Sequence, residues 1–307
     1  MPRSPTDFKT RDASSYDPVV DSFDALVTRF CAPFAERMVT LSEAQGAQRI
    51  LDVGTGTGIV ALRAGSRLGP DGETIGIDLS DGMLQTAREK ASRAGLDHVA
   101  FHKMDAEALD FPDNSFDVVL SLFALTHFPE PLTALREMHR VLRPGGRFVL
   151  GVGGGPPLLS RTGLAVCVGR LQREVRQWQG KQLTAPHFLD ALAIKHLHDS
   201  EAPEETQWAG RKRARAHIVR RLVKDAGFRD ITWDWLDQQA HLQTPEEFWD
   251  IQTTWSSIAR KRLLGASADQ VKVVKDEFRR ACDKVRSGGG RLVYPLAAFY
   301  ISARKLQ

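Results

Sequence analysis

Three glycines follow a short apolar run and could bring the backbone close to a bound ligand. RILDV, residues 49–53, has the composition of a buried strand, and Gly54, Gly56 and Gly58 come next. A turn directly after a buried strand needs residues that tolerate unusual backbone angles and permit close approach of a ligand. From Gly56 onward the string also satisfies the G-x-G-x-x-A form of the dinucleotide fingerprint. The loop therefore predicts a nucleotide-containing ligand without deciding which one.

Acidic residues accompany the first three expected strands. Asp52 lies two residues before the glycine loop. Asp78 ends the second apolar run, twenty residues after Gly58, where a carboxylate can accept both hydroxyls of a ribose. Asp105 follows the third run, and its carboxylate could accept a hydrogen bond from an adenine amino group. These acids favour a ligand that contains adenosine. The glycine loop and Asp78 by themselves would also fit a nicotinamide cofactor.

One histidine is well placed to accept a proton. His127 comes six residues after Ser121, on the loop that follows the fourth expected strand. Loops at the carboxyl ends of parallel strands line the ligand crevice, so His127 is our candidate general base. It could equally orient a substrate or hold the loop. The other histidines with suggestive spacing, His187, His196 and His198, have no flanking carboxylate at a familiar ligand spacing, and no metal site is predicted.

The elements around these residues alternate between short apolar runs and amphipathic stretches, as expected of helices that cross over a parallel sheet. FDVVLS, residues 116–121, has apolar residues on both faces of the expected strand, which is typical of a central strand covered by helices on both sides. The pattern predicts a doubly wound α/β core with helices starting near residues 59, 81 and 131, and with strands at 49–53, 74–78, 99–103, 116–121 and 147–152.

In order and spacing, residues 49–152 resemble a class I S-adenosylmethionine-dependent methyltransferase, close to the ubiquinone and menaquinone biosynthesis type and its small-molecule relatives. The strings that carry the resemblance are LDVGTGTG, MDA, FDVVLS, LTHF and VLRPGGRFVLG, together with the helix end AGF and the final strand. The resemblance implies a Rossmann-like seven-stranded methyltransferase sheet with an N-terminal helical lid and helical cap insertions. It also implies that S-adenosyl-L-methionine is the cofactor.

The resemblance assigns roles to individual positions. Asp52 and the loop Gly54–Gly58, which includes Thr55, match the part that holds the methionine end of the cofactor, and Asp78 matches the ribose-binding acid. Tyr16 resembles an N-terminal aromatic that closes over the cofactor, although a surface aromatic packing on the lid is an equal alternative. The remaining matches are Leu79 and Met83 against the adenine, Asp105 and Ala106 at the adenine edge, and Ser121 to Phe123 below the transferable methyl group.

The change of sequence pattern after the core divides the chain into four expected parts. They are a helical lid (1–42), the S-adenosylmethionine-binding core (43–152), an inserted cap (153–212) and a C-terminal part of the core (213–307) that carries a helical cap pair at 245–285. Pro295 lies within the last expected strand, and a proline there favours a strand at the edge of the sheet or a β-bulge. The segments outside the core carry many of the aromatic residues, which either wall an apolar acceptor pocket or form the core of the cap itself.

Composition excludes several classes of protein. With 307 residues, 42% hydrophobic and 26% charged, the chain is neither disordered nor collagen-like, and its three widely spaced cysteines suggest no disulfide framework. No apolar run is long enough for a membrane span and no secretory signal is evident, so we expect a cytoplasmic protein. The net charge of +4 is mild. The basic cluster from Arg211 to Arg221 most simply forms a solvated helix face, with RNA binding as the other interpretation.

The sequence therefore predicts methyl transfer from S-adenosylmethionine to an O, N or C atom of a small, aromatic or otherwise apolar metabolite. Three alternatives remain: a methyltransferase acting on RNA or another macromolecule, a nicotinamide-dependent oxidoreductase, and a non-catalytic cofactor-binding protein. Nucleic acid is disfavoured because SLFALTHF lacks the N-P-P-Y type of string that flips a base. The acceptor and the oligomeric state do not follow from the sequence.

Overall fold

The chain forms two compact units. The structure is a computed structural model that describes residues 5–46, 48–156, 161–184, 187–197 and 216–306. Unit 1 comprises Met1–Pro156, Glu205–Leu236 and Ala298–Gln307, and unit 2 comprises Pro157–Glu204 and Asp237–Ala297. The four-part division expected from the sequence stays a prediction.

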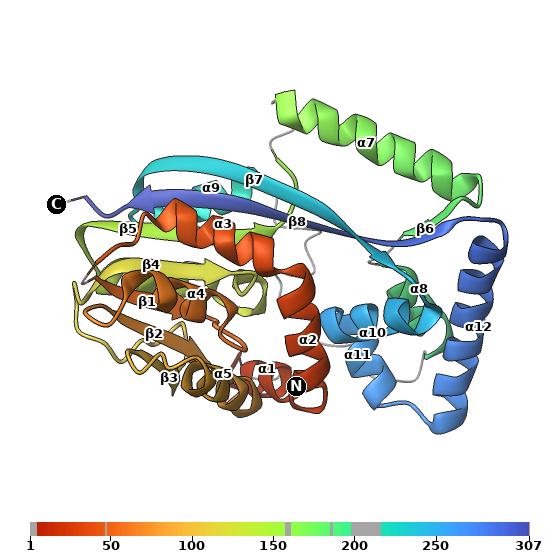
Figure 1. The fold of residues 1–307 in the computed structure, drawn as a ribbon, viewed down its shortest axis with the longest axis horizontal. Coiled ribbons are helices and arrows are strands. Elements are labelled where there is room, and N and C mark those ends of the chain that lie inside the picture. Colours follow the sequence, from red (N-terminus) through yellow and green to blue (C-terminus); the bar gives the residue numbers. More distant parts are fainter. Residues whose placement is uncertain (1–4, 47, 157–160, 185–186, 198–215, 307) are drawn as a thin grey trace. The chain divides into compact units, whose positions relative to one another are not determined.

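Unit 1 is built on a mostly parallel sheet in which the strand order is β3-β2-β1-β4-β5-β8 (Figure 1). The first five strands pair in parallel, and β8 is antiparallel to β5 and also pairs with β7. The order reverses at β1 and β4, which marks the topological switch point where ligands bind in such folds. The strands are β1 (Arg49–Val53), β2 (Glu73–Asp78), β3 (Val99–Lys103), β4 (Phe116–Leu122), β5 (Leu142–Gly153), β7 (Arg229–Leu242) and β8 (Arg291–Arg304).

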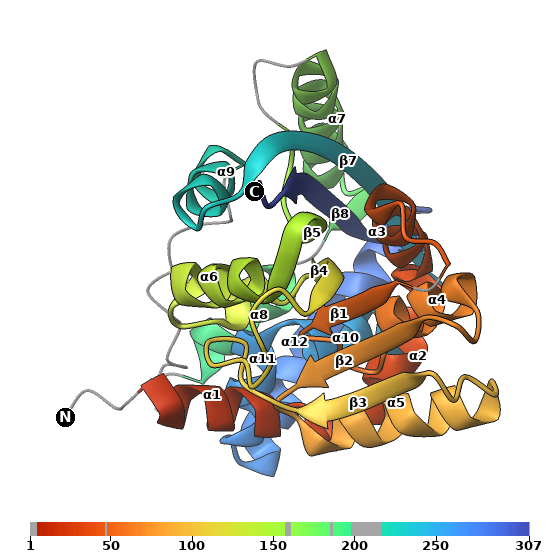
Figure 2. The ribbon, with the colours of Figure 1, turned by 90° about the vertical axis from the view of Figure 1, so that its left-hand side faces the viewer.

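Helices cover both faces of this sheet, as the burial of β1 and β4 requires. Helices α3, α4 and α5 lie on one face, and α6 and α9 lie on the other (Figure 2). In α6 the buried residues Ala134, Leu135, Met138 and Val141 recur at helical spacing and pack on the sheet. The helices are α3 (Ala32–Ser42), α4 (Ile59–Leu68), α5 (Asp81–Arg93), α6 (Pro131–Val141) and α9 (Ala216–Asp225). The predicted doubly wound α/β class is confirmed.

The N-terminal segment and the loop after β4 complete the description of unit 1. Before α3 the chain forms α1 (Pro5–Ser14), the one-turn helix η1 (Asp17–Val19) and α2 (Val20–Phe30). A second one-turn helix, η2 (Leu125–His127), follows β4. The connection from β3 to β4 contains no helix, so the alternation expected from the sequence is interrupted there.

The seven strands β1 to β5, β7 and β8 form the described sheet of unit 1, as predicted, and one further strand belongs to unit 2. The extra strand is β6 (Gln182–Thr184), which pairs in parallel with Arg291–Val293 of β8. A strand of three residues is too short to leave an alternating pattern in the sequence. Pro295, where an edge or a bulge was expected, lies in β8 between the residues that pair with β6 and those that pair with β5, and neither of these two registers includes it.

Unit 2 is mainly helical. The segment 245–285 was predicted to form two helices, but it forms three, because Ser256 and Ser267 each cap a new helix start with a side-chain hydrogen bond. Among the helices that the structure describes, in either unit, none is long and apolar enough to cross a membrane. The helices are α7 (Arg161–Trp178), α8 (His187–His196), α10 (Pro245–Trp255), α11 (Ser257–Leu264) and α12 (Ala268–Ser287).

The aromatic residues of unit 2 pack mainly against one another. Phe278 lies with its ring centroid 5.3 Å from that of Phe188, 5.6 Å from Phe248 and 5.2 Å from Trp249. These residues therefore form the core of the cap, which was one of the two interpretations of the sequence. Trp208 lies outside the described residues. The sequence analysis missed an apolar stripe on α7, where Leu164, Val168, Leu171, Val175 and Trp178 are exposed.

Candidate active site

The glycine loop after β1 is fixed by backbone hydrogen bonds to the end of β2. The N–H groups of Gly54 and Thr55 both donate to the carbonyl of Ile77, each at 2.9 Å. Gly54 has φ +72°, and a Cβ there would lie 2.3 Å from the Cβ of Ala124. Gly56 and Gly58 also have positive φ. Only glycine fits at position 54, both for its backbone angle and for its close approach to the loop after β4.

Asp52 joins the glycine loop to the start of α4. Its Oδ2 accepts hydrogen bonds from the Thr55 hydroxyl at 2.6 Å and from the Ala61 N–H at 3.1 Å. The side chain is buried, and burial raises the pKa of its carboxyl to about 7, although both hydrogen bonds oppose the shift. Asp52 therefore lies beneath the loop and holds its shape.

Asp78 connects the end of β2 to the same loop. Its Oδ2 accepts the Gly56 N–H at 2.9 Å, and its Oδ1 accepts the N–H groups of Leu79 at 2.8 Å and Ser80 at 3.1 Å. Burial raises the pKa of the Asp78 carboxyl, and the three backbone donors oppose that rise. One carboxylate thus lies at the switch point with its orientation set by backbone groups of two segments.

The start of α5 places Leu79 and Met83. Ser80 is the N-cap of α5, and its hydroxyl oxygen accepts the Met83 N–H at 3.2 Å. The Ser80 hydroxyl donates to Asp17 of η1 at 3.1 Å. Met83 is buried and Leu79 is partly exposed beside Asp78. The sequence gave no signal for the link to η1.

Asp105 is brought together with a lysine that the sequence analysis did not select. The Asp105 Oδ2 lies 2.7 Å from the Lys9 Nζ on α1, and Lys9 also pairs with Glu107 at 2.6 Å. The Asp105 Oδ1 accepts the Glu107 N–H at 2.9 Å. The neighbouring Ala106 is buried in the core of unit 1. The loop after β3 is therefore attached to α1 by charged side chains.

The segment from Ser121 to Phe123 is held by β1, β5 and α3. The Ser121 hydroxyl donates to the Val53 carbonyl at 2.9 Å and is completely buried. Phe123 has φ +61°, an uncommon angle for a residue with a side chain, and its ring lies 5.7 Å from that of Phe34. Backbone strain of this kind is concentrated at functional sites, and here it lies at the carboxyl end of β4.

His127 and Tyr16 lie side by side, although they are far apart in the sequence. The Nδ1 of His127 is 2.7 Å from the Oδ2 of Asp12 on α1. The Tyr16 ring meets the His127 ring edge-on at 5.9 Å and also packs on Phe23 at 5.6 Å. Lys9, Asp12 and Tyr16 are spaced at i, i+3 and i+7, and this helical period in the N-terminal segment is the signal that could have identified them.

The remaining selected features belong to other elements or lie outside the described residues. His196 pairs with Glu277 at 2.6 Å, and His198 and Arg211 to Arg215 lie outside the described residues. Arg220 and Arg221 are exposed on α9. In the described ranges no three His, Cys, Asp or Glu side chains could hold a metal ion.

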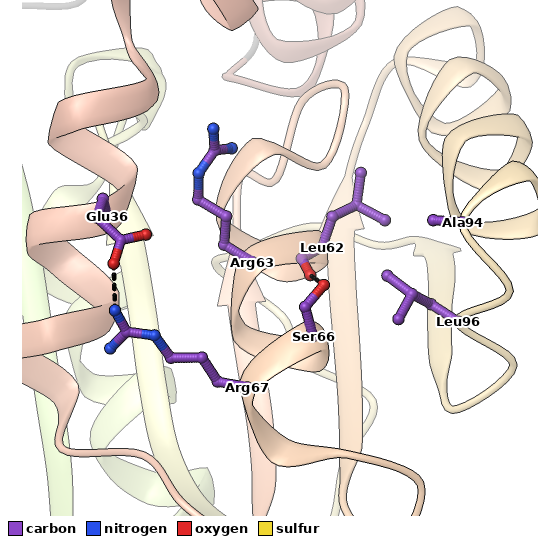
Figure 3. A pocket seen from close by; sticks show the side chains of 7 residues that line it. All are labelled: Glu36, Leu62, Arg63, Ser66, Arg67, Ala94 and Leu96. Carbon is purple, nitrogen blue, oxygen red and sulfur yellow. Dashed lines mark hydrogen bonds and ion pairs between the residues drawn. The ribbon is translucent and has the colours of Figure 1, made fainter.

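An open cavity of about 300 Å³ lies beside the later turns of α4 and not at the glycine loop (Figure 3). It lies among α3, α4 and the end of α5, and Arg67 pairs with Glu36 at its edge. Its lining contains none of the residues selected from the sequence: it consists of Glu36, Leu62, Arg63, Ser66, Arg67, Ala94 and Leu96. The candidate site is therefore the set of loops after β1, β2, β3 and β4 together with α1.

The sequence matches a family model described as a methyltransferase domain over residues 51–150. A ubiquinone/menaquinone biosynthesis C-methyltransferase from Ectopseudomonas mendocina is 37% identical over 224 residues, which cover 72% of this chain and 79% of that protein. An aklanonic acid methyltransferase from a Streptomyces species is 33% identical over 140 residues, which cover 46% of this chain and 64% of that protein.

Solved structures share the fold at lower sequence identity. The YcgJ protein from Bacillus subtilis superposes with a TM-score of 0.53 at 22% identity, covering 89% of this chain and 98% of that one. A phosphoethanolamine N-methyltransferase from Haemonchus contortus superposes with a TM-score of 0.56 at 19% identity, covering 99% of this chain and 61% of that one. Together with the extended match to the C-methyltransferase, these findings establish that the chain belongs to the class I S-adenosylmethionine-dependent methyltransferases.

Proposed function

We propose that this protein transfers the methyl group of S-adenosylmethionine to an O, N or C atom of a small, aromatic or otherwise apolar metabolite. The relatives support this acceptor class, since by their names they act on demethylmenaquinone, on ubiquinone and menaquinone precursors, and on aklanonic acid. These acceptors are all small molecules. The comparisons do not favour the oxidoreductase or macromolecular alternatives.

The residues present fit the cofactor. Gly54, Gly56 and Gly58 have positive φ angles, the backbone conformation that lets a glycine loop approach a ligand closely, and in this proposal the loop holds the methionine end. The Thr57 hydroxyl in the same loop is buried and has no hydrogen-bond partner among the residues that the structure describes, which is a polar group that a ligand can satisfy. In the proposed complex Asp52 supports the loop from below and the Asp78 carboxylate accepts the ribose hydroxyls.

The other predicted residues surround the adenine and the reacting carbon in this proposal. Leu79 and Met83 pack on the adenine ring, and the loop that contains Asp105 and Ala106 recognises its edge. Ser121 supports the floor through its hydrogen bond to Val53, and Phe123 lies at the end of β4. Tyr16 covers the site beside His127.

The chemical demands on the protein are small. The cofactor supplies an electrophilic sulfonium methyl group, so the chain must align the acceptor, exclude water and, where the acceptor carries a proton, remove it. His127 is the proposed proton acceptor because its ring lies on the loop after β4 and its Nδ1 is already engaged by Asp12. No metal ion is part of this proposal.

The observation that carries the proposal is the hydrogen bond from Gly56 N–H to Asp78, which joins the ends of β1 and β2 into one cradle. The experiment is calorimetric titration with S-adenosylhomocysteine and, separately, with NADH, followed by mass spectrometry of quinol and aromatic polyketide acceptors incubated with S-adenosylmethionine. We expect binding of S-adenosylhomocysteine and a mass gain of one methylene in a subset of acceptors. Uptake of NADH without uptake of S-adenosylhomocysteine would refute the proposal.

A further inference from the structure

Helix α1 crosses the loops after β3 and β4 with one polar side (Figure 2). Lys9 pairs with the loop after β3, and Asp12 pairs with His127 after β4. Asp12 is one turn beyond Lys9, so both side chains leave the helix on the same side. The position of Asp12 is therefore set by its own helix and by a second ion pair, and not only by His127.

The Asp12 carboxylate fixes which nitrogen of His127 is able to accept a proton. Its Oδ2 lies 2.7 Å from Nδ1, and only 8% of the Asp12 side chain is exposed, against 38% for His127. A carboxylate is solely an acceptor, so the Nδ1 of the imidazole donates to it. In the neutral ring the proton then resides on Nδ1, and Nε2 carries the free electron pair.

A second side chain also contacts the His127 ring. Asp12 faces the ring from α1, and Tyr16, which follows α1, contributes the edge of its own ring. Both contacts come from the N-terminal segment.

We propose that Asp12 is a positioning residue that holds His127 as an Nδ1–H tautomer, with Nε2 as the proton acceptor for methyl transfer. This inference rests on the proposed function. The acceptor's O–H, N–H or C–H proton moves to Nε2 while the acceptor's electron pair forms the bond to the methyl carbon. The bond between that carbon and sulfur breaks with its pair remaining on sulfur, and the imidazolium later releases its proton to water.

The test compares Asp12→Asn with Asp24→Asn. Asp24 on α2 forms an ion pair with Lys90 at 2.6 Å, so the control variant also removes a carboxylate that links the N-terminal helices to the core. We expect Asp12→Asn to lower kcat by roughly 10- to 100-fold while the KM for S-adenosylmethionine changes little, since oriented acid–base groups contribute factors of about that size. Asp12→Glu keeps the charge and should restore part of the rate, and Asp24→Asn should leave kcat unchanged.

A readout that does not depend on turnover is the tautomer itself. In ¹⁵N-labelled protein without ligands, the two ring nitrogens of His127, assigned by their loss in His127→Gln, should report an Nδ1–H ring in the natural sequence and in Asp24→Asn. Asp12→Asn should give a mixture of tautomers. The measurement on the natural protein remains decisive if Asp12→Asn does not fold.

The possible failures are separable. If the natural protein shows an Nε2–H ring, or if Asp12→Asn leaves both tautomer and kcat unchanged, Asp12 does not position His127, while the methyltransferase assignment stands. If His127→Gln keeps full kcat across pH 6 to 9, the base role is lost together with that of Asp12. Absence of S-adenosylhomocysteine binding to the natural protein would instead overturn the proposed function.

Discussion

The glycine loop and helix α1 border the same candidate site, but different forces hold them. In the loop, backbone N–H groups of Gly54 and Thr55 donate to Ile77, and Asp78 accepts the Gly56 N–H. Helix α1 is attached through charged side chains, Lys9 to Asp105 and Asp12 to His127. A helix of ten residues is marginal in isolation, so α1 depends on these attachments. The loop is thus fixed by backbone hydrogen bonds, whereas α1 is the proposed cover, and its attachment is expected to respond to charge.

The strongest test of the fixed geometry of the glycine loop is the variant Gly54→Ala. Its Cβ would overlap that of Ala124, and its φ of +72° disfavours any side chain, so we expect a loss of about 3 kcal/mol or more in the free energy of unfolding. Gly95→Ala is the matched control, because Gly95 has φ +65° with nothing within 4 Å, and it should lose only about 1 kcal/mol. Urea denaturation measures both. Equal losses would show that backbone angle alone, and not the close approach, explains the glycine.

A second test uses the buried acid beneath the loop. Burial raises the pKa of the Asp52 carboxyl from its ordinary value of 3.8 to about 7. Between these values the folded chain keeps a proton that the unfolded chain has lost, so Asp52 makes the free energy of unfolding fall as pH rises from about 4 to about 7. Asp52→Asn removes this contribution.

The measurement is urea denaturation from pH 4 to pH 8. The difference between Asp52→Asn and the natural protein should shift in favour of the variant as pH rises, and the exposed control Asp97→Asn should show no such trend. A difference that is constant with pH would mean that Asp52 does not retain its proton over this range.

The smallest effect on global stability is expected at α1. Lys9→Met removes both ion pairs to the loop after β3. We expect a loss of about 1 to 2 kcal/mol, because the partly buried Asp105 and Glu107 carboxylates lose their cation. Hydrogen exchange within Pro5–Ser14 should nevertheless become much faster, and high salt should accelerate it in the natural protein. Lys103→Met, which removes an exposed pair with Asp81, is the control. Unchanged exchange in α1 would contradict a cover held by charge.

The same difference explains what the sequence could predict. The glycine loop, Asp52 and Asp78 are adjacent to recognisable strands, and their hydrogen bonds join neighbouring parts of one motif, so their positions follow from the pattern. The pairs Lys9–Asp105 and Asp12–His127 join residues 96 and 115 positions apart, and only the folded sheet brings them together. The helical spacing of Lys9 and Asp12 shows that they share one side of α1, but it does not show which loops they contact.

Unit 2 illustrates a second limit. A helical segment beginning at residue 245 was predicted, and α10 begins there with Thr244 accepting the Glu247 N–H. The break between α10 and α11 was missed, since one serine ends the first helix and caps the second without glycine or proline. The aromatic cluster around Phe278 depends on packing among three helices, and the sequence left its role open.

The most direct test of the cradle is calorimetric titration of S-adenosylhomocysteine into the natural protein, Asp78→Ala and Asp81→Ala. Asp81 is an exposed residue at the start of α5 that pairs with Lys103, and it serves as the control. We predict binding to the natural protein, equal affinity in Asp81→Ala, and affinity weakened by roughly tenfold or more in Asp78→Ala, because a charged hydrogen bond contributes about 1.5 to 3 kcal/mol. Undiminished affinity in Asp78→Ala, or no binding to the folded natural protein, would contradict the account.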